Sequence, residues 1–303
     1  MKIWLLNTKK NKWAFWVKRV LEEWKKLWLR MKFVSIEDIE LVISSDGEET
    51  LFIKNKVVKL PNIVLPRNDT SYQIKSITDF LENKGVHIVN SNVSRFLAKD
   101  KFLSLQKLAL NAIPVPKTIL LKGVPNIPFI EEQLQYPIII KKIEWSQWRW
   151  IIKVNNREDL EDMIEMLEEN MKTLNRNLIL QEYIWEKSWQ DLRFFVVWSR
   201  IIGSMLRKWK EWDFKSNFSG WGKVFDHIPT EREEILALDS TSIIWLDIAW
   251  VDMLFDKDNG YKICEVNASP WFEWLEKATW KNIAAEIVNY IAKRYNIKTS
   301  QSL

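Results

Sequence analysis

Short apolar runs alternate with longer amphipathic segments along the first third of the chain. Residues 2–6 are mostly apolar, and a polar turn separates them from residues 14–27, where apolar residues include Phe15, Val20 and Leu27. A strand, a turn and a helix in this order are typical of the start of an α/β layer. The same patterns predict a helix at 74–83 and strands at 31–36, 57–60, 62–67 and 86–90.

Beyond residue 90 the pattern predicts helices between antiparallel strands. A helix at 91–109 should end at Asn111-Ala-Ile-Pro-Val-Pro. Proline cannot continue a helix, so this pair of prolines marks a subdomain boundary. Strands are predicted at 118–121, 136–142, 178–184, 191–197, 200–207, 220–225, 249–255 and 261–266, with helices at 157–174, 231–247 and 281–295. The chain therefore belongs to the mixed α/β (α+β) class.

Composition narrows the classes of protein that the chain can belong to. Its 303 residues are 47% hydrophobic and carry a net charge of +5, which suits two or three packed domains. The single cysteine, Cys264, excludes a disulfide framework, and we interpret it as an inert buried thiol. Charged residues interrupt every long apolar run, so we expect a cytoplasmic, soluble protein without a signal peptide or a membrane span.

Chemistry must rest on lysine, arginine and carboxylates, because two isolated histidines are too few for a zinc cluster or a catalytic triad. The stretch Lys262–Trp274 contains Glu265 and Asn267, two residues apart on a predicted strand and so on one face. Asp252, on the preceding predicted strand, could add a second carboxylate. Oxygen ligands of this kind favour Mg²⁺. The alternative is a chance polar pair at a solvated strand end.

Two further strand ends carry candidate anion contacts. Lys141 ends the apolar run 136–142, and a lysine at the end of a buried strand is typical of phosphate sites. The turn after it would cap phosphates with backbone N–H groups if it were rich in glycine. Arg67 ends the predicted strand at 62–67, and we interpret it either as an anion contact or as an ordinary surface arginine.

Tryptophan and glycine depart from ordinary usage in opposite directions. The chain has 19 tryptophans and only 7 glycines, where about 21 glycines would be usual. Tryptophans stand in predicted turns and near a helix end, as at Trp24, Trp28, Trp145 and Trp221, where a bulky side chain fits poorly. Our hypothesis is that UGA encodes glycine in this gene and is rendered here as tryptophan. UGG codons at these positions would contradict it and favour a tryptophan-rich ligand-binding protein.

Six ordered motifs resemble those of the ATP-grasp ligases, and the RimK-like branch most closely. They are Asp100-Lys101, Lys141 with the loop after it, Gln181-Glu-Tyr-Ile, Asp191-Leu-Arg, Lys210-Glu-Trp-Asp-Phe-Lys-Ser-Asn and Glu265-Val-Asn-Ala-Ser-Pro. The resemblance implies an ATP-grasp fold with an N-terminal α/β domain at 1–92 and an ATP-grasp domain at 93–298. The latter would divide into a lid subdomain at about 115–185 and a C-terminal subdomain at about 186–298, which clamp the nucleotide between them.

The resemblance also implies roles for individual residues. Arg193, Arg207, Lys215 and Asn217 would be catalytic, and Asp252, Glu265 and Asn267 would hold the metal. Lys215 stands where the family more often has arginine, which puts bidentate binding there in doubt. The expected nucleotide contacts are Lys101, Lys141, Ser146, Gln147, Glu182, Tyr183, Asp191, Lys215, Ser216 and Asn217.

The activity implied by the resemblance is ATP-dependent ligation of a carboxylate to an amine, with ADP released and an acylphosphate formed. Mg²⁺ or Mn²⁺, as two ions, would assist. The donor would be glutamate or a similar amino acid, and the acceptor would be a peptide, a protein C-terminus such as that of a ribosomal protein, or a small molecule. We expect no nucleic-acid readout and no membrane contact, and a homo-oligomer is possible. The alternatives are a nucleotide-binding regulatory module without ligase activity and the tryptophan-rich binding protein.

Overall fold

The computed structural model describes residues 1–27, 31–67, 71–121, 125–143, 151–170, 178–208 and 223–297. Its first layer is a parallel sheet in the order β2-β1-β6-β7. These strands are β1 (Ile3–Asn7), β2 (Met31–Ser35), β6 (Ile63–Pro66) and β7 (His87–Ile88). β1 and β6 are buried along their whole length, as the apolar runs predicted. The helices α1 (Phe15–Lys26) and α2 (Tyr72–Asn83) accompany this sheet.

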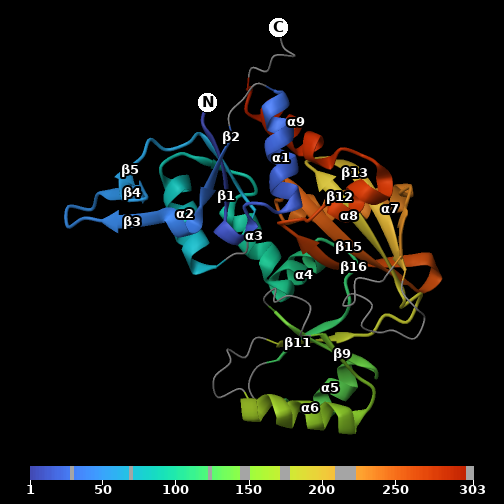
Figure 1. Cartoon of the computed structure of the whole chain (residues 1–303). Helices are drawn as coiled ribbons and strands as arrows, with labels where there is room; N and C mark the ends of the chain where they lie inside the picture. Colours follow the sequence, from blue (N-terminus) through green and yellow to red (C-terminus); the bar gives the residue numbers. More distant parts are fainter. Residues whose placement is uncertain are drawn as a thin grey trace.

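A small antiparallel sheet projects from this first layer (Figure 1). It consists of β3 (Ile39–Ile43), β4 (Glu49–Ile53) and β5 (Lys56–Val57), in that order. The predicted strand at 57–60 is wrong for most of its length, because β5 ends at Val57. Pro61 lies four residues after the end of β5, and the residue before it, Leu60, lies outside any strand.

A second antiparallel sheet lies apart from the rest of the molecule, at the bottom of Figure 1. Its order is β10-β9-β11-β8, from β8 (Thr118–Leu121), β9 (Ile138–Lys142), β10 (Ile151–Val154) and β11 (Leu178–Glu182). The helices α5 (Ile127–Gln133) and α6 (Arg157–Asn170) pack on it. Ile130, Ile138, Leu160 and Leu180 belong to a buried cluster made only of this part of the chain. The sheet therefore has a core of its own.

The remaining sheet has five antiparallel strands in the order β14-β13-β12-β15-β16. They are β12 (Gln190–Val197), β13 (Arg200–Lys208), β14 (Lys223–Asp226), β15 (Ile248–Asp256) and β16 (Gly260–Asn267). The helix α7 (Glu231–Ile243) begins at Thr230, whose hydroxyl accepts from the Glu233 N–H while Glu233 bonds back to the Thr230 N–H. Two more helices, α8 (Glu273–Thr279) and α9 (Ile283–Arg294), follow β16.

The N-terminal layer, built on the parallel sheet, and the C-terminal layer, built on the five-stranded sheet, share one apolar core. Ile3, Leu5 and Val17 from the N-terminal layer lie in the same buried cluster as Phe195 and Ile287 from the C-terminal layer. The helices α1 and α9 lie side by side where these layers meet (Figure 1). Burial of apolar surface at this junction stabilises the arrangement.

Other elements also differ from the predictions, among them β3 and β4, which were not predicted. The predicted helix at 91–109 is two helices, α3 (Asn92–Lys99) and α4 (Lys101–Leu110). They separate at Asp100, which has extended φ and ψ and whose carboxylate accepts from the Leu103 N–H, so it caps α4. The short helices α5 and α8 were not predicted, since seven residues are too few to show a clear helical period.

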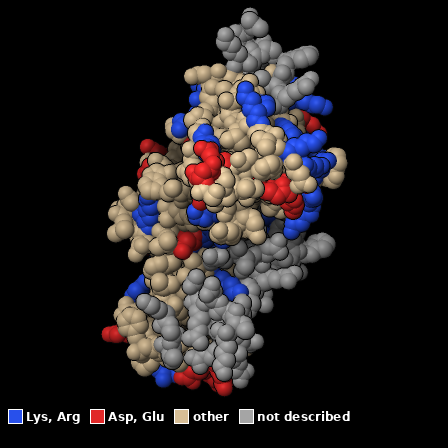
Figure 2. Space-filling view, turned by 90° about the vertical axis from the view of Figure 1, so that its left-hand side faces the viewer, with Lys and Arg blue, Asp and Glu red and all other residues tan. Residues whose placement is uncertain are grey.

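The described surface is of mixed charge. On the face drawn in Figure 2, basic and acidic side chains are interspersed. In the described part of the chain, no helix combines the length and the apolar character needed to cross a membrane.

Among the described residues, three tryptophans occupy backbone conformations that favour glycine. Trp198, Trp245 and Trp280 have φ of 58°, 60° and 57°. Trp280 ends α8 and donates its N–H to the Glu276 carbonyl, as a left-handed cap does. Trp24, by contrast, lies inside α1 and is fully buried, so the expectation that a bulky side chain fits poorly there was wrong. Positive φ therefore supports the glycine hypothesis at 198, 245 and 280, and the coding DNA remains its direct test.

Exchanging Trp280 for glycine should stabilise the fold. A side chain in the left-handed region costs about 1–2 kcal/mol, and Trp280 is 92% exposed, so little packing would be lost. We expect Trp280→Gly to raise the free energy of unfolding by about 1 kcal/mol. Trp274, also exposed and inside the same helix, is the matched control, because glycine there should lower stability by about 1 kcal/mol. Urea unfolding of both variants measures this, and equal losses in both would contradict the argument.

Candidate active site

One face of the five-stranded sheet carries a row of acidic and basic side chains. Asp252 on β15 lies directly opposite Arg193 on β12 and opposite Glu265 on β16. Two residues before Arg193 on β12, Asp191 lies opposite Arg207 on β13. Directly opposed residues on neighbouring strands point to the same face. The sheet therefore gathers five of the predicted site residues from four strands.

Asp191 and Arg207 form a bidentate ion pair at the β13 end of this row. The Arg207 Nε donates to Asp191 Oδ1 at 2.7 Å, and its terminal nitrogen donates to Asp191 Oδ2. The same guanidinium lies 3.5 Å from Asp252 Oδ2. Burial opposes the charge on Arg207, but Asp191 and Asp252 outweigh it and raise the pKa of the guanidinium. Burial raises the pKa of Asp191, and Arg207 opposes that shift.

The three predicted metal ligands come together where β15 and β16 pair. Asp252 is opposite Glu265, and Asn267 is opposite Trp250 on the same two strands. Arg193 donates to Asp252 Oδ2, whereas Asp252 Oδ1 is buried without a hydrogen-bond partner among the described residues. A buried carboxylate oxygen of this kind is suited to a cation. The described residues contain no cluster of three or more His, Cys, Asp or Glu side chains, so any ligand set here includes Asn267 or water.

Two of the predicted phosphate lysines point into the same region. The Lys101 Nζ at the start of α4 lies 2.9 Å from Glu265 Oε1. The Lys141 Nζ on β9 donates to Gln181 Oε1 at 2.7 Å and lies 3.5 Å from the Cys264 Sγ. Burial raises the pKa of the Cys264 thiol, as expected of an unreactive thiol. Lysines from α4 and from β9 thus reach the strand that carries Glu265.

Glu182 joins the four-stranded sheet of β8 to β11 to the five-stranded sheet. Its Oε1 accepts from the Lys117 N–H at 2.6 Å and from the Lys262 Nζ on β16 at 2.7 Å. Tyr183 follows, with the Lys153 Nζ 4.5 Å from the centre of its ring. The ion pair between Glu182 on β11 and Lys262 on β16 therefore links the two sheets directly.

Sequence reasoning missed two residues of this region, Lys262 and Gln181. Strict alternation backwards from Glu265 puts Lys262 on the opposite face of β16. A β-bulge at Cys264 adds a residue, so Leu254 pairs with Lys262 and the lysine returns to the charged face. Gln181 is 2% exposed and donates to the Thr118 hydroxyl while it accepts from Lys141. A glutamine within the apolar run of β11 was the available signal.

Other predicted residues lie outside the described residues. They are Ser146, Gln147, Lys215, Ser216 and Asn217. Their assignments stay predictions.

Comparison with known proteins decides the family. A family model described as the RimK-like ATP-grasp domain matches residues 98–291. The chain belongs to the RimK-like ATP-grasp family. This result confirms the expected family. It also confirms the expectation that the protein is a ligase that forms C–N bonds.

Individual relatives agree with this membership. A protein of Haemophilus influenzae (strain PittEE), named "Probable alpha-L-glutamate ligase", is 33% identical over 230 residues, which cover 75% of this chain and 76% of the relative. The RimK domain protein of Sphaerobacter thermophilus DSM 20745 has a TM-score of 0.75 at 16% identity, over 96% of this chain and 99% of that one.

A third similar protein was solved with a nucleotide and a metal. The ATP-grasp ligase PsnB, solved with a minimal precursor, Mg and ADP, has a TM-score of 0.72 at 16% identity, over 96% of both chains. These structural likenesses confirm the expected ATP-grasp fold. The roles of individual residues and the domain boundaries at 92, 115, 185 and 298 stay predictions.

Proposed function

We propose that this ATP-grasp ligase joins a carboxylate of an acceptor to the amine of glutamate or a similar amino acid, with ATP converted to ADP and phosphate. The observation that carries the proposal is the row of Arg193, Asp252 and Glu265 across three strands, with Lys101 reaching Glu265 from α4. Such a surface holds two adjacent carboxylates between basic side chains. A metal–polyphosphate group is a ligand of that pattern.

The chemistry needs positioned charges rather than a nucleophilic side chain. An acceptor carboxylate oxygen attacks the γ-phosphorus of ATP, the bond to the ADP oxygen breaks, and an acylphosphate forms. The donor amine then attacks the acyl carbon, the bond to the phosphate oxygen breaks, and the amine loses a proton as the amide forms. Lys101 and Lys141 neutralise phosphate oxygens in this proposal, and Arg193 and Arg207 stabilise the charge on the transferred phosphoryl group.

The residues at the end of β15 and β16 fit Mg²⁺ as the metal. Asp252 and Glu265 would bind it with Asn267, and the unpartnered Oδ1 of Asp252 is the atom best placed for this. When bound, Mg²⁺ supplies charge neutralisation for the phosphates. Two ions, with Mn²⁺ as a substitute, would suit the same ligands.

The names of similar proteins support the choice of substrates. The Haemophilus influenzae relative is named as a glutamate ligase, and PsnB is complexed with a precursor peptide. We therefore propose glutamate as donor and a peptide or a protein C-terminus, such as that of a ribosomal protein, as acceptor. Glu182 and Tyr183 would hold the adenine and ribose, with Asp191 near the ribose.

We expect the protein to release ADP only when MgATP, an amino acid and an acceptor are all present. The assay couples ADP release to a panel of amino acids and carboxylate-bearing peptides, and mass spectrometry of the peptide detects added glutamyl residues. Glutamate should give the fastest release. Tight binding of ATP without ADP release for any pair in the panel would contradict ligation and favour the regulatory nucleotide-binding module.

A further inference from the structure

The N-terminal layer holds the segment that directly follows the proposed metal ligand Asn267. Three residues of that layer reach it. The Asn90 side chain donates to the Ala268 carbonyl, the buried Arg67 guanidinium donates to the Pro270 carbonyl, and Arg19 pairs with Glu276 on α8. Arg67 is 6% exposed, so its interpretation as an ordinary surface arginine was wrong. These contacts tie residues 268–276 to a different layer of the fold.

Asn90 makes the most complete set of these contacts. Its Nδ2 donates to the carbonyls of Ile248 and Ala268, both at 2.8 Å. Its Oδ1 accepts from the backbone N–H groups of Asp247 at 2.7 Å and Ile248 at 2.8 Å. A side-chain amide has two N–H donors and one oxygen with two lone pairs. Every hydrogen-bonding position of this buried amide, which is 3% exposed, is therefore used on the C-terminal layer.

These bonds lie at the end of the strand pair that carries the proposed metal ligands. The last residue pair between β15 and β16 is Trp250 with Asn267. Asn90 bridges Ile248 and Ala268 just beyond that pair, so its amide takes the place of the next cross-strand connection. The Asp252 and Glu265 pair lies farther inside the ladder and has other support from Arg193 and Lys101. Asn267 is thus the ligand whose backbone depends most on Asn90.

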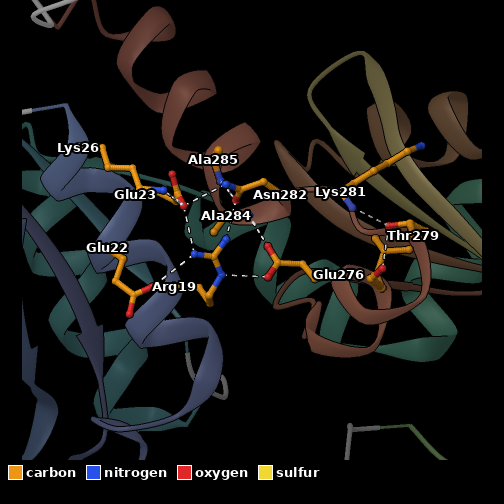
Figure 3. Close-up of polar contacts among 11 residues, drawn as sticks. Arg19, Glu22, Glu23, Lys26, Glu276, Thr279, Lys281, Asn282, Ala284 and Ala285 are labelled. Atoms are coloured by element: carbon orange, nitrogen blue, oxygen red, sulfur yellow. Dashed lines mark hydrogen bonds and ion pairs between the residues drawn. The ribbon is translucent and has the colours of Figure 1, made fainter.

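Arg19 supports the other end of the same segment (Figure 3). Its Nε donates to Glu276 Oε2 at 3.0 Å, and its terminal nitrogen donates to Asn282 Oδ1 at 2.8 Å. The second oxygen of Glu276 accepts from the Ala284 N–H at 3.1 Å. Figure 3 shows Arg19 on α1 between these two groups of the C-terminal layer. The segment is therefore fixed at both ends.

We propose that Asn90 is a positioning residue for the metal site, which acts by holding the backbone that presents Asn267. The inference rests on the proposed function, in which Asn267 is a metal ligand. Groups that orient metal ligands commonly change metal affinity by about 10–100-fold when they are removed. Asn90 itself would touch neither metal nor nucleotide.

The test compares Asn90→Ala with Asn92→Ala. Asn92 is also a buried amide, 4% exposed, but its side chain bonds Asp79 at 2.7 Å and Thr78 at 2.6 Å, inside the N-terminal layer. Calorimetric titration of ADP with and without Mg²⁺ gives the factor by which Mg²⁺ strengthens ADP binding. We expect Asn90→Ala to lower this factor about tenfold and to leave metal-free ADP affinity unchanged. Asn92→Ala should leave the factor unchanged, although both substitutions lower the melting temperature.

Two further variants keep the outcome decisive. Asn90→Ser retains one hydroxyl donor and should give an intermediate factor, and it replaces Asn90→Ala if that variant does not fold. In an Asn267→Ala background, Asn90→Ala should cause little further loss, because both changes act on one ligand. An unchanged factor in the Asn90 variants, or an equal loss in Asn92→Ala, overturns the positioning role while the metal site stands. A wild-type protein whose ADP binding ignores Mg²⁺ overturns the proposed metal site, and the positioning role with it.

Discussion

Replacing Glu265 with glutamine should lower the turnover number of the ligase about a hundred- to a thousandfold. The substitution keeps the size of the side chain and an oxygen that can accept from Lys101, which lies 2.9 Å from the carboxylate. It removes the negative charge that would hold Mg²⁺ opposite Asp252, and loss of one preorganised charge contact at a reacting phosphate has an effect of this size. The measurement is the rate of ADP release at saturating ATP, glutamate and acceptor, as a function of Mg²⁺ concentration.

Glu286→Gln is the matched control for this substitution. Glu286 also accepts from a cation at 2.9 Å, the Arg200 guanidinium, but this pair is exposed on another part of the molecule. We expect the control to turn over at the wild-type rate, and both variants to unfold within about 1 kcal/mol of the wild type. A Glu265→Gln enzyme that keeps wild-type turnover and Mg²⁺ dependence would remove Glu265 from the proposed metal site.

The strands of the site could be predicted from the sequence because their patterns are local. Asp252, Glu265 and Asn267 each lie in or at the end of an apolar run, and a period of two is enough to place Glu265 and Asn267 on one face. The pairing of these two consecutive strands was also predicted, whereas the register that sets Asp252 opposite Glu265 depends on the bulge at Cys264. Lys141 was predicted from its place near the end of an apolar strand, whereas Lys101 was predicted from the family resemblance alone.

What could not be predicted depends on irregular or distant contacts. The bulge at Cys264 puts Lys262 on the charged face, and nothing in the residue types of β16 marks that extra position. Asn90 contacts Ile248 and Ala268 across 158 and 178 residues of sequence, so no local pattern could reveal its partners. Asp100 is a different case, because an aspartate before an amphipathic run is a recognisable helix start that a single long helical period concealed.

Removing Arg207 should destabilise the fold strongly, and more at neutral than at acidic pH. Arg207→Ala leaves Asp191 and Asp252 buried without the guanidinium that joins them, and breaking a buried pair in this way costs about 3–5 kcal/mol. Arg200→Ala, on the same strand, is the control. Arg200 is 70% exposed and its ion pair should contribute less than about 1 kcal/mol.

The pH dependence follows from the direction of the shift at Asp191. Burial already raises the pKa of this carboxyl, and loss of Arg207 removes the charge that opposes the rise. Above the ordinary aspartate pKa of about 3.9, the folded variant then holds a proton that the unfolded chain has released, so its stability falls as pH increases through that range. We therefore expect the loss of unfolding free energy caused by Arg207→Ala to become smaller as the pH is lowered from 7 to about 5. The loss caused by Arg200→Ala should stay constant, and urea unfolding measures both. A deficit that grows on acidification would mean that Asp191 remains ionised without its arginine, and that another cation replaces Arg207 beside it.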